Sequence, residues 1–152
     1  MLGLLLSPAL AADMAAVRAL TQAGANDLAL RLMERAQPPP TDAAGWMSWE
    51  RERFAIYRSR SDHAAILRRA DTLPADLPPD FIDWVQTEAA HAALALRRTD
   101  DARSRLRARL WREKQVPALA RHWRQLLIQS YLIDDNIDDA LRALHRDRGK
   151  YR

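Results

Sequence analysis

The acidic stretch at residues 134–141 (DDNIDDAL) is the first place where residue types and their spacing could bind an ion. A calcium-binding loop takes oxygen ligands at its first, third and fifth positions, and Asp134, Asn136 and Asp138 supply them. Such a loop also needs glycine at its sixth position and a bidentate glutamate at its twelfth, where this chain has Asp139 and His145. Because both positions fail, we interpret the stretch as a turn whose carboxylates satisfy free N–H groups at a helix start.

A second spacing with metal chemistry is Glu88-Ala-Ala-His91, which puts a carboxylate and an imidazole on one helix face. Di-iron bundles need two such motifs and glutamates from two further helices, whereas this sequence has one. The chain has no cysteine, which excludes thiolate catalysis, disulfides and thiolate metal sites. It also lacks zinc-protease, serine-hydrolase and phosphate-loop motifs. We therefore expect no metal, no cofactor and no catalytic residue.

Arginine is the third chemical feature, since it carries almost all of the basic charge behind the formal net charge of +4. Five arginines on one expected helix define the basic ridge: Arg103, Arg105, Arg107, Arg109 and Arg112. Their guanidinium groups would suit an anionic partner, such as a phosphate-bearing polymer or an acidic protein. The alternative is an outer helix face in water, paired with the chain's many acidic residues. Nucleic acid is not favoured, because no aromatic residues alternate with the arginines to stack on bases.

The elements that would position these groups repeat along the chain. Tryptophans recur 38 and 39 residues apart, at Trp46, Trp84 and Trp123. An aspartate followed two positions later by an alanine recurs at intervals of 38 residues, starting at Asp62. Two marks with one period indicate repeated units. Alanine, leucine and arginine dominate while glycine is scarce, so the units should be helical and the fold class all-α.

Helical periodicity, prolines and capping residues divide the chain into four expected helix pairs. The expected helices cover residues 13–23 and 26–36, 43–59 and 61–74, 81–97 and 101–113, and 117–133 and 138–147. Gly24 is the expected break after the first helix, Asn26 and Asp80 are expected N-caps, and Thr41 or Asp42 should cap the third helix.

The spacing inside these pairs resembles the tetratricopeptide repeat. In that family a large apolar residue is followed nine positions later by alanine, and four beyond that by a second large apolar residue, as in Leu20/Ala29/Met33 and Tyr131/Ala140/Leu144. The units here are longer than the family's usual length of about 34 residues. The resemblance implies a right-handed array of about four antiparallel helix pairs, a tetratricopeptide-like solenoid. It also implies a concave surface, lined by the first helix of each pair, that binds proteins or peptides without catalysis.

Candidate ligand-binding residues on these first helices are Glu50, Arg53, Tyr57, Glu88, His91 and Arg124. On a helical wheel Glu50 and Arg53 fall inside the apolar face of one long helix, and Glu88 inside that of the next. First helices of consecutive units lie side by side in such arrays, so Arg53 would face Glu88. One interpretation is a polar spot that grips a ligand. The other, which we prefer, is an ion pair that fixes the register of two units.

The N-terminus has the pattern of an export signal. Residues 1–11 (MLGLLLSPALA) contain an apolar run and an A-x-A cleavage motif, although no basic residue precedes the run. We expect these residues to be removed, leaving a single helical domain over residues 12–152 in the periplasm. The alternative is an apolar N-terminal helix that belongs to the fold.

The C-terminal helix pair ends without a following unit. Solenoids need polar capping repeats, yet Ile137, Leu141 and Leu144, with Trp123 and Leu127 on the preceding helix, would have nothing to cover them. We expect self-association through this end, or a longer array of which this chain is the N-terminal part.

These features together predict a non-catalytic, protein- or peptide-binding helical-repeat scaffold of the bacterial cell envelope, without a transmembrane segment. One alternative is a helical accessory segment of a cell-wall-processing enzyme complex. Another, if the chain is not exported, is a basic nucleic-acid-binding helical protein.

Overall fold

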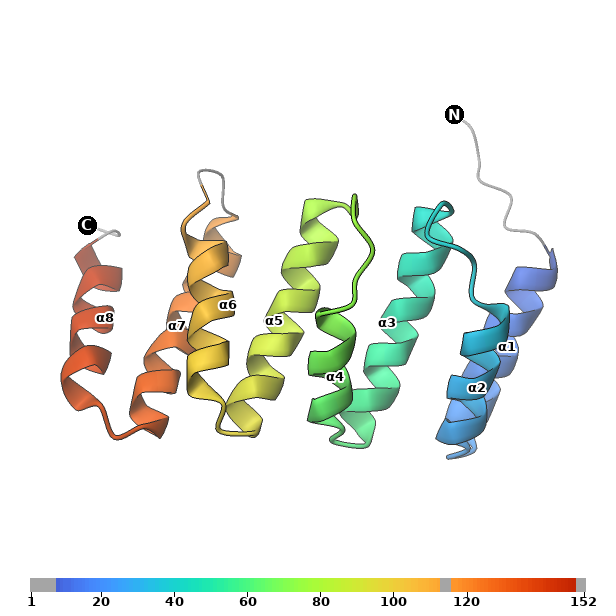
Figure 1. Ribbon diagram of the computed structural model, residues 1–152, viewed down its shortest axis with the longest axis horizontal. Helices are drawn as coiled ribbons and strands as arrows, with labels where there is room; N and C mark the ends of the chain where they lie inside the picture. Colours follow the sequence, from blue (N-terminus) through green and yellow to red (C-terminus); the bar gives the residue numbers. More distant parts are fainter. Residues whose placement is uncertain (1–7, 113–115, 150–152) are drawn as a thin grey trace. The chain divides into compact units, whose positions relative to one another are not determined.

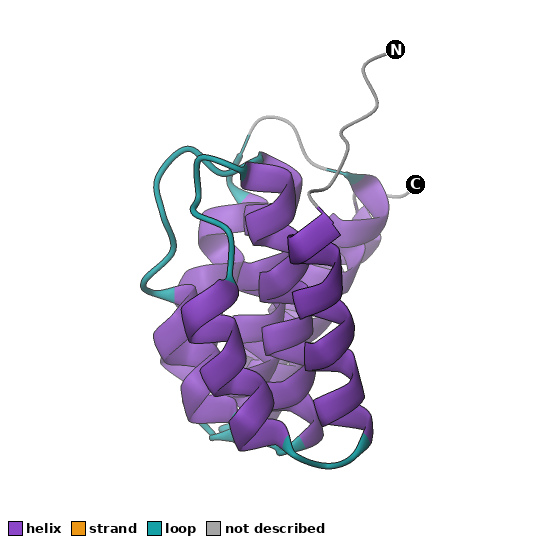
Figure 2. Cartoon of the chain, turned by 90° about the vertical axis from the view of Figure 1, so that its right-hand side faces the viewer, coloured by secondary structure: helices purple, strands orange, loops and turns teal. Residues whose placement is uncertain are grey.

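All the regular secondary structure described by the computed structural model is α-helix, which confirms the predicted all-α class (Figures 1 and 2). The described residues are 8–112 and 116–149. They form eight helices: α1 Pro8–Gln22, α2 Asn26–Ala36, α3 Ala43–Ser59, α4 His63–Ala70, α5 Pro79–Ala95, α6 Thr99–Leu110, α7 Pro117–Ile133 and α8 Ile137–Gly149. Contacts divide the chain into two compact units with a boundary between Asp62 and His63, and each unit is described by itself.

The bounds of α2, α3 and α7 are those predicted from the sequence, and other helices differ at their ends. α4 ends at Ala70, before the expected Pro74. α5 begins at Pro79, so Asp80 lies in its first turn and the prediction of Asp80 as its cap is wrong. Proline suits this position because the first helical N–H has no partner inside the helix. α6 begins two residues earlier than predicted, at Thr99, and ends three residues earlier.

Helix α1 begins at Pro8, not at the predicted residue 13. The segment that we expected to contain the cleavage site is therefore helical in its described part. Residues 1–7 and the side chains of residues 8–12 lie outside the description. The predicted signal peptide consequently stays a prediction.

The four longer helices α1, α3, α5 and α7 end in the same backbone motif. Each is followed by one residue with positive φ: Gly24 at 75°, Ser61 at 54°, Arg97 at 56° and Asp135 at 55°. The N–H of the next residue then bonds the carbonyl five positions back, from Ala25, Asp62, Arg98 and Asn136 to Leu20, Tyr57, Ala93 and Tyr131, at 2.8–2.9 Å. This is the Schellman motif, which satisfies carbonyls left free at a helix end. Its recurrence every 36–38 residues confirms Gly24 as a break and gives the repeated unit a structural basis.

The first unit contains α1, α2 and α3, each in contact with the other two. Its core includes Val17, Ala29, Met33, Trp49 and Ile56, with Leu20 packed against them. Of the two predicted caps of α3, Asp42 is the one used, since its carboxylate accepts the N–H of Gly45 at 3.1 Å. The predicted cap Asn26 is wrong, because Ala25 holds the N-cap position of α2.

The second unit runs from α4 to α8, and consecutive helices contact one another throughout (Figure 1). α5 also contacts α7 directly, as α1 contacts α3 in the first unit. Trp123 is fully buried, so the prediction that it lacks cover is wrong. Ile137 and Leu141 on α8 are 56% and 48% exposed, as predicted for an uncovered face, whereas Leu127 and Leu144 are half-buried. Self-association through that face stays a prediction.

Candidate binding pocket

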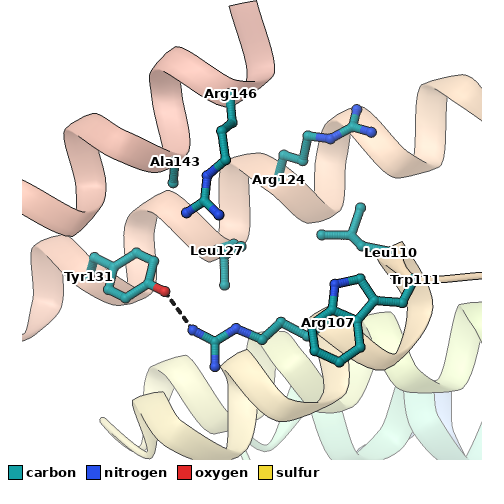
Figure 3. Close-up of a pocket in the computed structure, with 8 residues that line it drawn as sticks. All are labelled: Arg107, Leu110, Trp111, Arg124, Leu127, Tyr131, Ala143 and Arg146. Atoms are coloured by element: carbon teal, nitrogen blue, oxygen red, sulfur yellow. Dashed lines mark hydrogen bonds between the residues drawn. The ribbon is translucent and has the colours of Figure 1, made fainter. Parts of the chain in front are cut away.

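A pocket of about 210 Å³ lies in the second unit, lined from α6, α7 and α8. Its lining residues are Arg107, Leu110 and Trp111 from α6 and its C-cap, Arg124, Leu127 and Tyr131 from α7, and Ala143 and Arg146 from α8 (Figure 3). Three of these eight side chains are cationic and none is acidic. The pocket is therefore suited to a ligand that carries both negative charge and apolar surface.

Arg107 and Tyr131 form the polar end of the pocket. Nη2 of Arg107 donates a hydrogen bond of 2.6 Å to the Tyr131 hydroxyl oxygen. Because that oxygen accepts from the guanidinium, the hydroxyl proton can be donated to another acceptor. Figure 3 shows the Arg146 guanidinium reaching from α8 toward the same end, on the other side of Tyr131 from Arg107. Two cations and one hydroxyl donor thus flank a space where an oxyanion would make charge-assisted hydrogen bonds.

Trp111, Leu110 and Leu127 form the apolar part. Trp111 is 82% exposed, more than any other large hydrophobic residue in the described chain. Its indole lies on the far side of the pocket from Tyr131, and the Arg124 guanidinium points outward at that side (Figure 3). Tryptophan and arginine supply much of the binding energy in protein interfaces, because both combine a large planar surface with polar groups. An exposed indole between arginines is consequently a feature of a contact surface.

Four arginines of the basic ridge pair with acidic residues, as the alternative interpretation predicted, but their side chains are only 11–31% exposed and so are not fully solvated. Toward α5, Nη2 of Arg112 contacts both carboxylate oxygens of Asp83 at 2.5 and 2.6 Å. Arg109 lies 3.5 Å from the same carboxylate, and Arg105 bonds Asp71 at 2.7 Å. The physical reason is that neighbouring elements place acidic residues beside α6: Asp83 on α5, Asp71 directly after α4 and Asp134 at the C-cap of α7.

On the side that faces α7, Arg103 forms an ion pair with the turn that follows α7. It contacts Asp134 at 2.8 Å, and its guanidinium carbon lies 5.0 Å from the ring centroid of Tyr131. Burial alone would lower the pKa of Arg103, but its hydrogen bonds to Asp100 and Asp134 outweigh burial and raise it. The hydrogen bond from Arg103, followed by that from Thr99, lowers the pKa of Asp134. These contacts position the Tyr131 ring at the pocket.

Residues 134–136 form the turn between α7 and α8, and residues 137–141 begin α8, which confirms the hairpin interpretation. The Asn136 side chain accepts the N–H of Asp139 at 3.2 Å and donates to the Asp139 carboxylate at 2.9 Å. That bond to Asn136, together with one from Arg142, lowers the pKa of Asp139. The side chain that caps α8 is thus the Asn136 amide and not a carboxylate. The carboxylates of Asp134 and Asp139 form ion pairs with Arg103 and Arg142.

Glu50 and Arg53 form a buried cluster in the first unit, together with Gln37. Glu50 is fully buried and Arg53 is 6% exposed. Arg53 Nε lies 3.2 Å from the Glu50 carboxylate, and Gln37 donates to Glu50 at 2.7 Å while accepting from Arg53 at 2.8 Å. Tyr57 is half-buried and packs against the Phe54 ring. The ion pair of Arg53 is therefore with Glu50 on the same helix, α3. Glu88, the partner that the sequence predicted for Arg53, lies on α5 in the other unit.

His91 meets a histidine that the sequence analysis did not connect with it. Nε2 of His91 lies 3.1 Å from Nε2 of His122, which joins α5 to α7. Partial desolvation of the ring lowers the pKa of His91, and the neighbouring His122 lowers it further, while Glu88 raises it. Neither histidine lines the pocket.

Of the six predicted ligand-binding residues, only Arg124 lines the pocket, and of the basic ridge only Arg107 does. Trp111, Tyr131 and Arg146 were missed as candidates. Trp111 gave one local signal, since it is a large aromatic residue at the end of a strongly basic helix. Tyr131 and Arg146 gave none, because the pocket brings together residues up to 39 positions apart.

Comparison of the chain with protein-family models, with curated proteins and with solved structures finds no match. Within residues 8–112 and 116–149, no helix has the length and hydropathy needed to cross a membrane.

Proposed function

We propose that this protein is a non-catalytic, tetratricopeptide-like scaffold that binds a partner protein or peptide through the pocket between α6, α7 and α8. In this proposal the partner places an acidic side chain between Arg107 and Arg146. An adjacent hydrophobic side chain of the partner covers Trp111 and Leu127.

The single observation that carries the proposal is the combination of Trp111 and the pocket arginines. Exposed indole surface is unfavourable in water, and its burial contributes roughly 25 cal/mol per Å² of apolar surface. Arg107 and Arg146 lie in a pocket without an acidic lining residue, so their guanidinium groups attract negative charge. A segment with one acidic and one large apolar side chain satisfies both features at once.

The repeated helix ends support the array architecture. The same Schellman motif closes α1, α3, α5 and α7, and the contacts α1–α3 and α5–α7 join alternate helices. Both features are expected if the helices form a right-handed array of about four pairs. The export pattern of residues 1–11 supports a periplasmic location for this scaffold.

A selection from a random peptide library tests the proposal. Peptides enriched on the wild-type protein should carry Asp or Glu close to Trp, Phe or Leu. Enrichment should be lost with Arg146→Glu and with Trp111→Ser, because each removes one half of the recognised pattern. Arg121→Glu is the matched control, since Arg121 is exposed on α7 and does not line the pocket. Equal enrichment on all four proteins would refute the proposal.

A further inference from the structure

Two histidines from different helices point their ε nitrogens at each other in the second unit. His91 on α5 and His122 on α7 have an Nε2–Nε2 distance of 3.1 Å and a ring-centroid distance of 5.2 Å. The centroid distance exceeds the nitrogen distance by nearly the sum of the two ring radii, so the rings meet end to end. In this hydrogen bond one Nε2 carries the hydrogen and donates, and the other Nε2 accepts through its lone pair.

This arrangement places two nitrogen donors close enough together to bind one cation. In the hydrogen-bonded state the two nitrogens share one N–H hydrogen. Imidazole nitrogen is also a good ligand for Zn²⁺, Cu²⁺ and Ni²⁺. The pair lies at the surface, with His91 exposed and His122 half-buried, so an ion in water can reach it.

We propose that His91 and His122 form a two-histidine site for a divalent transition-metal ion, which cross-links α5 to α7. With metal–nitrogen distances of about 2.0–2.1 Å, nitrogens 3.1 Å apart subtend an angle of about 100° at the ion. That angle lies between the square-planar and tetrahedral values. Because the two ε nitrogens point at each other, each imidazole must turn by about 40° so that its lone pair points at the ion.

Glu88 supplies a carboxylate to the same neighbourhood. It precedes His91 by three residues on α5, so both side chains lie on one helix face, and its charge raises the pKa of His91. No group of three or more His, Asp, Glu or Cys side chains in the described residues stands ready to hold a metal. The two imidazoles are therefore the fixed ligands, and water or a reoriented Glu88 completes the coordination. This donor set favours Cu²⁺ over Ni²⁺ and Zn²⁺, following the general order of divalent metal affinity.

The test is isothermal titration of the tag-free full chain with CuCl₂, NiCl₂ and ZnCl₂ in a buffer that does not bind metals, with thermal unfolding as a second readout. We expect one ion per chain and a rise in Tm at about 100 µM metal, because the ion binds the folded arrangement and not the separated histidines. His91→Gln and His122→Gln should each weaken binding at least about tenfold and remove the Tm shift. His63→Gln and His145→Gln are the controls and should leave both unchanged.

Two results would overturn the proposal. One is the absence of binding by all three ions to the wild-type protein. The other is unchanged affinity in both His91→Gln and His122→Gln, because metal bound elsewhere would not respond to them. If either variant unfolds, the ε-nitrogen resonances of the wild-type histidines on addition of ZnCl₂ decide the matter. Shifts at His91 and His122 support the site, and shifts only at His63 or His145 contradict it.

Discussion

Gly24 and Asp135 occupy the same position in the same helix-ending motif, at φ values of 75° and 55°. Gly24 adopts this left-handed conformation without strain, whereas Asp135 pays a steric cost for its Cβ. We predict that Asp135→Gly stabilises the protein by up to about 1 kcal/mol, since the relief of strain exceeds the entropy that glycine adds to the unfolded chain. Gly24→Ala should destabilise it by about 1 kcal/mol, although an added Cβ would meet no atom within 4 Å. Urea unfolding measures both, and a less stable Asp135→Gly variant would contradict the motif's role.

Asp83 is the acidic centre that holds α6 against α5. Its side chain is 10% exposed and contacts both Arg112 and Arg109. Asp83→Asn should cost about 2–3 kcal/mol of unfolding free energy, below the value for a fully buried pair because both arginines reach solvent. Asp100→Asn is the control, since Asp100 also contacts an arginine but its side chain is 98% exposed, and it should change little. Equal effects in urea unfolding would mean that burial does not set the strength of these pairs.

Arg53 supplies a cation to the fully buried Glu50. Arg53→Met should destabilise the protein by about 3–5 kcal/mol, because it removes that cation from a desolvated carboxylate. Arg53→Ala should cost more, since it also removes the packing of the side-chain stem. The double variant Glu50→Gln/Arg53→Met should recover part of the loss, because a neutral amide needs no cation. A double-mutant cycle without coupling between the two positions would contradict this interpretation.

Asp134 should give part of the stability a pH dependence. Its folded-state pKa lies below the ordinary value of 3.8, through hydrogen bonds from Arg103 and Thr99. The unfolded state therefore binds the proton first, and the stabilisation is present above the ordinary pKa and lost as pH falls through the folded value. Urea unfolding between about pH 6 and about pH 3 should show a steeper loss for wild type than for Asp134→Asn. Parallel curves would mean that the contact with Arg103 contributes nothing.

The helices and their ends were largely predictable from the sequence, because their signals are local. Gly24, Asp42 and Pro117 mark helix boundaries by their own backbone or side-chain chemistry. Asp80 misled because aspartate favours both the cap and the first turn of a helix, and Pro79 decided between them.

The pocket was not predictable, since its chemistry depends on which arginines have acidic neighbours in space. Arg105 and Arg107 are both arginines, two residues apart on one helix. Arg105 nevertheless forms an ion pair with Asp71, whereas Arg107 donates a hydrogen bond to Tyr131. That difference arises because Arg105 reaches the end of α4, where Asp71 lies, whereas Arg107 reaches α7. Gln37 was missed for the same reason, as its partners Glu50 and Arg53 are 13 and 16 residues away.

The most direct test of the proposed binding function is an NMR titration of the isotopically labelled protein with the most strongly enriched library peptide. The peptide should shift the indole N–H of Trp111 and the guanidinium N–H of Arg107 and Arg146, since these groups line the pocket. Arg121 on the same helix α7 as Tyr131 should not shift. Peptide binding with shifts confined to the first unit, and none at Trp111 or Arg146, would contradict the proposal.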